Sequence, residues 1–271
     1  MEKDPDNAMP REVESTLAVV SENPRKIIDA LCGLSCLAGY RLIPEGTREI
    51  RDIYYDTEDG ALKRERIGFR IRERKGHPSL VALKGPATAC RESGVVSRLE
   101  VEEAWSEETL RNLLGNLGRR GIAFSSVPTF HRDPQMTLEN LGLAVVQDRE
   151  TRRRVWNAVA DDEGKGDPLA EMVIDTVTYR CDGSRLVHRE VEVEALSPAD
   201  DASVLSVGAL ITALADRFKG ELRAWDHGKL PTGKMLCKIA GEGRLAGHVF
   251  PSGELGPGAY SLLEAAFVKE A

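Results

Sequence analysis

Three arginines stand at every second position in the segment GFRIRERK, residues 68–75. They are at positions 70, 72 and 74, with Phe69 before the first and Ile71 between the first two. Because side chains of a β-strand alternate between its two faces, this spacing would place three guanidinium groups on one face and apolar groups on the other. A face of this kind is typical either of a solvated surface or of a cavity that holds an anion.

Acidic and basic side chains follow the same alternation in different segments. Glutamates alternate with valines at 12–14 and 190–194, whereas arginines alternate or cluster at 70–72 and 152–154. A merely solvated surface usually mixes the two signs and is rich in lysine, but arginine dominates the basic segments here. Arginine binds phosphate oxygens in pairs through its planar guanidinium and does not lose its proton. The segregation favours an anion site, and an ordinary amphipathic sheet with one charged face in water is the alternative.

Carboxylates and guanidinium groups together are suited to phosphate chains. Carboxylate oxygens are ligands that Mg²⁺ and Mn²⁺ prefer, and arginine or lysine would bind the oxygens of a polyanion that bridges to them. An unpaired buried ion is costly, so such faces could turn inward only if acids met bases, cations or water. In one basic segment we expect Val155 to face the helices, which would turn Arg152 and Arg154 toward the charged side.

The composition argues against some classes of protein. The 271 residues carry a formal net charge of −7, although 30% of them are charged. We do not expect a nucleic-acid partner, because such a surface usually shows as a net basic patch. The chain contains no run of 18 apolar residues, and it begins with the acidic and polar segment MEKDPDNAMP. These features predict a cytoplasmic protein that does not enter a membrane.

Alternation with a period of two predicts mostly antiparallel strands. We expect eight or nine of them, at 11–20, 38–44, 48–56, 66–75, 79–85, 97–105, 145–157, 169–179 and 187–196. Apolar spacing and N-terminal caps predict helices at 23–34, 106–117 and 197–218, with shorter ones near 135–141 and 259–271. If these helices cover the apolar side of a closed sheet, the charged faces point into its lumen, and eight strands leave room there for one small ligand.

The sequence resembles the CYTH domain family, which is named for a bacterial adenylate cyclase and thiamine triphosphatase and belongs to the triphosphate tunnel metalloenzymes. EVEST at 12–16 lies where that family has its Glu-x-Glu-x-Lys signature, with Thr16 in place of the lysine. The similarity extends over residues 11–240 through YYDTEDGALKRERIGFRIRER (54–74), SLVALKGP (79–86), SRLEVEE (97–103), RETRRRVW (149–156), EMVIDTVTY (171–179), REVEVEAL (189–196) and, more loosely, TGKMLCK (232–238).

This resemblance implies an α+β fold with a closed antiparallel eight-stranded β-barrel, or tunnel, that has a charged interior and helices packed outside. By the same comparison we expect residues 1–10 to form a flexible N-terminus and residues 11–240 to form the tunnel domain. Residues 241–271 would then be a C-terminal extension with a short helix. We expect a monomer or a homodimer.

The resemblance also implies an activity, namely the hydrolysis of inorganic or organic triphosphates with Mg²⁺ or Mn²⁺ by in-line attack of water. Asp175, Glu192 and Glu194 would be the catalytic carboxylates. The metal ligands carried over by position are Glu12, Glu14, Glu100, Glu102, Asp175, Glu192 and Glu194. The phosphate-binding residues carried over in the same way are Arg70, Arg72, Lys84, Arg152, Arg154 and Lys234.

Thr16 leaves other functions open, because a hydroxyl in place of an ammonium removes one attraction for phosphate. A module that binds polyphosphate or a nucleotide with little turnover is one alternative. A class IV-like adenylate cyclase is a second, and a structural sheet whose charged faces lie in water is a third.

Overall fold

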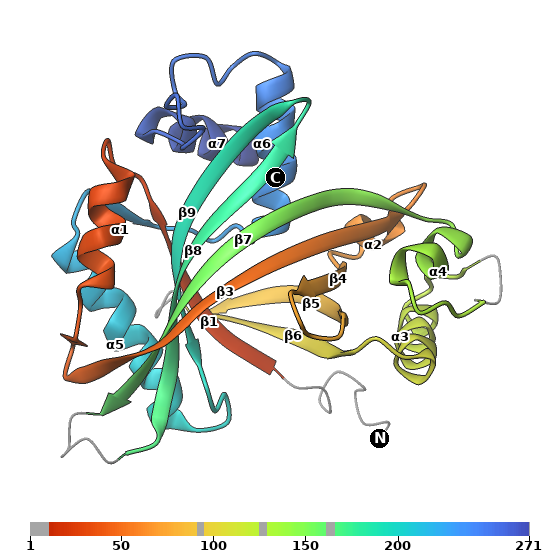
Figure 1. Cartoon of the computed structure of the whole chain (residues 1–271), viewed down its shortest axis with the longest axis horizontal. Coiled ribbons are helices and arrows are strands. Elements are labelled where there is room, and N and C mark those ends of the chain that lie inside the picture. The colour runs from red at the N-terminus through yellow and green to blue at the C-terminus, as the bar shows by residue number, and fades with distance from the viewer. Residues whose placement is uncertain (1–10, 91–94, 125–128, 161–165, 271) are drawn as a thin grey trace. The chain divides into compact units, whose positions relative to one another are not determined.

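A computed structural model of the chain describes residues 11–90, 95–124, 129–160 and 166–270 (Figure 1). The described residues form seven helices and a large antiparallel sheet, which confirms the α+β class. The segment 1–10, expected to be flexible, lies outside the described residues. In the part of the chain that the structure describes, no helix is both long enough and apolar enough to cross a membrane.

The sheet has ten strands in the described residues rather than the expected eight. In sheet order they are β10-β1-β6-β5-β4-β3-β7-β8-β9, with β2 paired to β3 and an additional pairing of β1 with β9. The short strands β2 and β10 account for the excess. Closure into a barrel stays a prediction. The bounds are β1 Arg11–Val19, β2 Cys36–Leu37, β3 Tyr40–Thr57, β4 Gly68–Arg74, β5 Leu80–Cys90, β6 Val95–Ala104, β7 Leu143–Ala160, β8 Pro168–Cys181, β9 Ser184–Ala195 and β10 Leu222–Ala224.

One expected division in the sheet is absent, because the predicted strands 38–44 and 48–56 are a single strand, β3. Gly46, between them, has a φ of 117°, a conformation that glycine adopts without the steric cost other residues meet. The strand therefore continues through a position that the sequence suggested as a break.

The chain divides into two compact units. The first consists mainly of Glu49–Thr88 and Arg98–Arg149, and the second mainly of Glu12–Arg48 and Glu150–Ala271. The long strands β3 and β7 each contribute residues to both units. Each unit is described below by itself.

The first unit packs three helices on one face of its strands. They are α2 (Ala61–Arg64), α3 (Glu107–Arg119) and α4 (Pro134–Asn140). Ser106 caps α3 by accepting a hydrogen bond from the Thr109 amide, and the buried leucines of that helix join the same apolar cluster as Phe69 and Ile71. Phe69 and Ile71 of β4 therefore face the core, and Arg70 and Arg72 face the opposite side.

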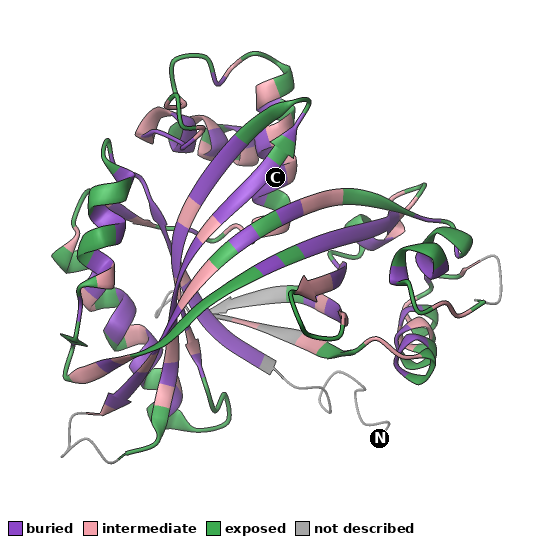
Figure 2. Ribbon diagram, viewed as in Figure 1, coloured by how far each residue is buried: buried purple, intermediate pink, exposed green. Residues whose placement is uncertain are grey.

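The second unit contains α1 (Pro24–Cys32) and α5 (Asp201–Arg217), which match two predicted helices. Asn23 caps α1, and Pro24 occupies its first turn. Both helices share one apolar cluster with β8 and β9, through residues such as Ile174 and Val191. Figure 2 shows buried residues on the strands of this unit and on one side of its helices.

The second unit also contains α6 (Lys229–Gly241) and α7 (Pro257–Glu270). A helix near α7 agrees with the sequence pattern, but α6 was not expected, because KLPTG places a proline and a glycine in its first two turns. Proline is tolerated in a first helical turn, because the amide that it lacks has no partner within the helix there. A disulfide joins Cys181 of β8 to Cys237 of α6, so this helix is fixed covalently to the sheet.

Candidate functional site

Two clusters of charged residues lie on the strands, one in each unit. The basic cluster is in the first unit and consists of Asp52, Tyr54, Arg70, Arg72, Lys84, Glu100, Glu102 and Arg149. The acidic cluster is in the second unit and consists of Arg153, Asp175, His188, Glu190, Glu192 and Lys229.

Strand register assembles the basic cluster. In the antiparallel pair of β3 and β4, Asp52 lies opposite Arg72, and Tyr54 lies opposite Arg70. Cross-strand partners share one face, so these four side chains point to the same side. Their neighbours Ile53 and Ile71 belong to the apolar cluster on the other face.

Asp52 is the centre of the basic cluster. Its carboxylate accepts hydrogen bonds from Nε and Nη2 of Arg72, at 2.8 and 3.2 Å, and from Nη2 of Arg149, at 2.9 Å. A third arginine, Arg70, brings its Nε to 3.7 Å from Oδ1. The Asp52 side chain is only 2% exposed, so the three arginines compensate a carboxylate that water scarcely reaches.

Arg70 connects Asp52 to two further carboxylates. Its Nη2 donates to Oε1 of Glu100 at 3.1 Å and to Oε2 of Glu102 at 2.8 Å. Lys84 completes the group, with its Nζ 2.7 Å from Oε2 of Glu100. Arg70, Arg72, Lys84, Glu100 and Glu102 were predicted from the sequence as site residues, and they lie together in the structure.

The electrostatics of the basic cluster favour negative charge. Burial opposes ionisation of Asp52, but the charges of Arg70, Arg72 and Arg149 outweigh it and hold the pKa of this carboxyl well below its usual range. Burial likewise raises the pKa of Tyr54, yet the nearby arginines lower it overall. With four cationic side chains against three carboxylates, the cluster has one positive charge in excess.

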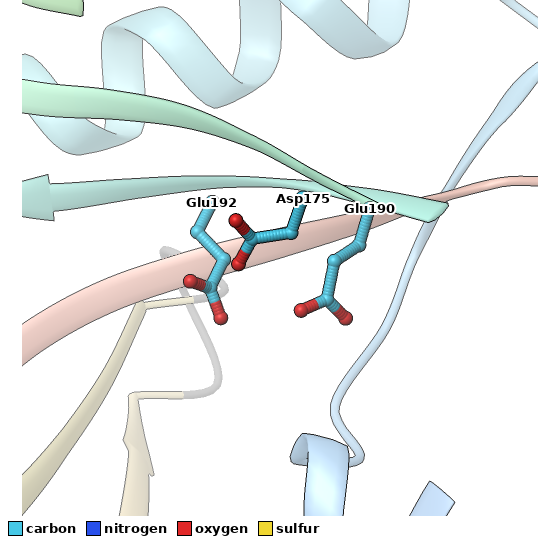
Figure 3. Close-up of side chains that lie close together, drawn as sticks. All are labelled: Asp175, Glu190 and Glu192. Atoms are coloured by element: carbon cyan, nitrogen blue, oxygen red, sulfur yellow. The ribbon is translucent and has the colours of Figure 1, made fainter. Parts of the chain in front are cut away.

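The acidic cluster is also built by register. Asp175 of β8 lies directly opposite Glu190 of β9, and Glu192 is two residues further along β9 on the same face. Figure 3 shows the three side chains projecting to the same side of the strands. One ligand oxygen from each lies within 4.8 Å of the others. Like charges this close are destabilising unless cations compensate them.

Two cations compensate the three carboxylates. Arg153 of β7 donates from Nε to Asp175 at 2.9 Å, and its Nη2 donates to both Asp175 and Glu192 at 2.6 Å. Lys229, at the start of α6, places its Nζ 3.0 Å from Oδ2 of Asp175 and in contact with Glu190 and Glu192. These carboxylates raise the pKa of Lys229 although its burial acts in the opposite direction. With three acids against two cations, the excess is one negative charge.

A buried histidine extends the acidic cluster. Nε2 of His188 lies 2.7 Å from Oε2 of Glu190, and its Nδ1 lies 3.0 Å from the Tyr260 hydroxyl. His188 and Glu190 are 0% and 1% exposed at their side chains. Tyr260 belongs to α7, so the C-terminal segment helps to orient one of the carboxylates.

Three other predicted carboxylates lie on β1 and β9, two paired strands of the second unit. Glu14 of β1 is the cross-strand partner of Glu194 of β9, and Thr16 is the partner of Glu192. Glu12 and Glu14 are buried. The residue that stands in place of the signature lysine therefore shares a face with one of the three clustered carboxylates.

The expectation that Arg152 and Arg154 turn toward the charged side is wrong, because Arg153 does so. Trp156, rather than Val155, belongs to the apolar cluster beneath the helices, and alternation then places Arg153 on the charged face. Arg152 is exposed, and Arg154 donates from Nη1 to the Cys32 sulfur at 3.0 Å.

Seven residues of the two clusters were not predicted as site residues: Asp52, Tyr54, Arg149, Arg153, His188, Glu190 and Lys229. For two of them, alternation of charged and apolar residues could have placed the side chain on the charged face. Asp52 alternates with Ile53, and Glu190 alternates with Val191. Lys229 carried no such signal, since its segment did not predict a helix and its contact is set by tertiary structure. The predicted Lys234 lies one and a half turns later on α6.

The acidic cluster fits a hard divalent cation. Asp175, Glu190 and Glu192 offer carboxylate oxygens close enough together to share one ion. Mg²⁺ and Mn²⁺ take such ligands, usually with water in the remaining positions. Among the described residues, no other group of three acidic, histidine or cysteine side chains comes this close together.

Comparison with known proteins gives a family match and similar structures. A model of the CYTH domain matches residues 23–214, which begins after EVEST and ends before α6. None of the curated proteins compared with the chain matches it.

Among solved structures, HpAC1 of Hippeastrum, a candidate adenylyl cyclase described with a dominant triphosphatase activity, is similar at a TM-score of 0.52 and 17% identity. The similarity covers 82% of this chain and 95% of that chain, and it shows a common fold. A candidate adenylate cyclase of Bacillus halodurans gives a TM-score of 0.46 at 18% identity, over 82% of this chain and 97% of that one.

Proposed function

The chain belongs to the CYTH domain family, and from this premise we propose that it hydrolyses a phosphoric anhydride bond of triphosphate compounds, either inorganic triphosphate or an organic triphosphate. The observation that carries the proposal is the pair of clusters with opposite excess charge, because a triphosphate needs cationic side chains and its counter-cation needs carboxylates. The activity described for the Hippeastrum protein, which shares the fold, is consistent with it.

The basic cluster would bind the phosphate oxygens. Arg70, Arg72 and Lys84 already hold fixed positions through their carboxylate partners, so little side-chain freedom would be lost on binding. Arg149 would join them, since it bonds to the same Asp52. Guanidinium groups held in advance stabilise the charge that spreads over phosphoryl oxygens during transfer.

The acidic cluster would hold Mg²⁺ or Mn²⁺ through Asp175, Glu190 and Glu192. When bound, such an ion supplies neutralisation of phosphate charge and a lower pKa for water. We propose that Glu12, Glu14 and Glu194 lie within reach as additional ligands, directly or through water. Glu100 and Glu102, expected from the resemblance as ligands, would here chiefly orient Arg70 and Lys84.

The chemical step would be in-line displacement at the terminal phosphorus. The oxygen of a water molecule forms the new bond to phosphorus, the bond to the bridging oxygen breaks, and diphosphate or its organic ester leaves with the electron pair. Glu192 or Glu194 would orient the water and accept its proton. The tunnel expected from the sequence is part of this proposal, and it is supported by the pairing of β9, at one end of the strand order, with β1 near the other end.

Phosphate release from tripolyphosphate, thiamine triphosphate and ATP, each with Mn²⁺ or Mg²⁺, tests the proposal. We expect release of phosphate from at least one of them. Cyclic AMP from ATP would instead identify a cyclase, and tight tripolyphosphate binding by calorimetry without release would identify the binding module that Thr16 left open. Folded protein that neither binds nor cleaves any of the three would overturn the proposal.

A further inference from the structure

Lys229 contacts one oxygen of each of the three carboxylates that a divalent cation would need. Its ammonium contacts Asp175, Glu190 and Glu192, which are the same three residues whose ligand oxygens lie within 4.8 Å of one another. An ammonium has three N–H donors and therefore can serve one carboxylate with each. A divalent ion and this ammonium cannot both bind at those oxygens.

The two cations of the acidic cluster differ in how firmly they are held. Arg153 binds Asp175 through two nitrogens of its planar guanidinium, a bidentate geometry that adds both energy and direction. Lys229 contributes a point charge on a flexible four-carbon stem, with a side chain that is 10% exposed. The lysine is therefore the cation that can leave by rotating its side chain.

The backbone of Lys229 is fixed, so release would not require the helix to move. The Tyr179 hydroxyl donates to the Lys229 carbonyl at 2.8 Å, and the Trp225 indole donates to Thr232 Oγ1 at 3.1 Å. The Trp225 amide donates to the carbonyl of Thr16 at 3.0 Å, and the disulfide holds α6 further along. The same contacts bring the lysine to Glu192, the cross-strand partner of Thr16.

We propose that Lys229 is an internal counter-ion of the acidic cluster, which is exchanged for a divalent cation when that cation binds. Without the cation, the ammonium compensates carboxylates whose burial would otherwise be costly. On exchange, the freed ammonium becomes available to an anion. This inference rests on the proposed function for the identity of the cation, and it assigns to α6 a role that lies outside the residues matched by the family model.

Mn²⁺ binding by calorimetry tests the exchange without any triphosphate. Lys229→Met removes the competing charge, so we expect the Mn²⁺ dissociation constant to fall about tenfold or more relative to wild type. Lys238→Met is the matched control, because Lys238 lies on the same helix but pairs with Glu270 at the surface. The Mn²⁺ affinity of this variant should equal that of wild type. Equal or weaker Mn²⁺ binding by Lys229→Met, or no binding by either protein, would overturn the inference.

A second measurement uses the wild-type chain, in case Lys229→Met does not fold. Brief labelling with an amine-reactive acetylating reagent, read by mass spectrometry, should modify Lys229 faster when Mn²⁺ is present, with Lys238 unchanged. Labelling of Lys229 that is unchanged or slower with Mn²⁺ would contradict the exchange. Neither readout involves turnover, so the two hypotheses can fail separately. If the protein cleaves triphosphate but fails these tests, only this inference is refuted. If it passes them but cleaves no triphosphate, only the proposed function is refuted.

Discussion

The basic and acidic clusters are built on the same plan with the charges reversed. In the first unit, the carboxylate of Asp52 is surrounded by three arginines. In the second, the ammonium of Lys229 is surrounded by three carboxylates. Each central group is buried or nearly so, and the ring of opposite charges around it compensates its burial.

The difference between them lies in the sign of the charge left over. Four cations and three carboxylates leave the basic cluster with one excess positive charge, whereas two cations and three carboxylates leave the acidic cluster with one excess negative charge. Cross-strand pairing places like charges side by side in both, as with Asp175 and Glu190. The comparison indicates that in each cluster one central charge offsets the mutual repulsion of the like charges around it.

The largest expected effect comes from removing the central charge of the basic cluster. Asp52→Asn leaves Arg70, Arg72 and Arg149 buried beside one another without their carboxylate, and we expect a loss of about 3–5 kcal/mol in the free energy of unfolding. Urea unfolding measures it. Tripolyphosphate should restore part of the loss, because its oxygens would replace the missing carboxylate. An Asp52→Asn variant as stable as wild type would show that the Asp52 carboxylate does not compensate the three arginines.

Removing one arginine of the ring should chiefly affect catalysis. Arg72→Ala is expected to lower kcat/KM for tripolyphosphate by about 10²–10³-fold, since a preorganised charge at the phosphate is lost. The matched control is Arg51→Ala, whose side chain lies on the neighbouring strand but is 46% exposed and pairs with Asp148 and Glu73. An equal loss in both variants would contradict a specific role for Arg72.

The pH dependence of stability should reflect Asp52. Its pKa in the folded chain is lowered, so the stability that it contributes is fully present above the unfolded value, about 3.9, and is lost as the pH falls through the folded value. Denaturant titrations at pH values from about 6 downward give the free energy of unfolding at each pH. We expect this free energy to fall less steeply with decreasing pH for Asp52→Asn than for wild type. The same pH dependence in both proteins would show that the arginines do not hold the Asp52 carboxylate ionised.

The smallest effect is expected at the surface. Arg51 binds Asp148 and Glu73 in geometry as good as that of the clusters, but water screens these pairs. Arg51→Ala should therefore change the free energy of unfolding by only about 0.5 kcal/mol. A loss comparable to that of Asp52→Asn would mean that burial does not separate the two classes of ion pair.

Much of the fold and part of the site could be read from local sequence pattern. Alternation identified the face of β4 that carries Arg70 and Arg72, because the alternate residues Phe69 and Ile71 are buried in the apolar core. The same rule failed at β7, where Val155 and Trp156 are both buried and only contacts decide which faces the helices. Lys229 could not be predicted, because its place depends on the contacts of α6 with β8 and with Trp225, which in turn bonds to β1.

The most direct test of the opposite preferences of the two clusters is phosphate release over a grid of tripolyphosphate and Mn²⁺ concentrations. For Arg72→Ala, we predict that half-saturating tripolyphosphate rises about tenfold or more while half-saturating Mn²⁺ stays near that of wild type. For Glu192→Gln, the half-saturating concentration of Mn²⁺ should rise instead, while that of tripolyphosphate stays near the wild-type value. If both variants shift both concentrations equally, or if wild type releases no phosphate at any point of the grid, the account is contradicted.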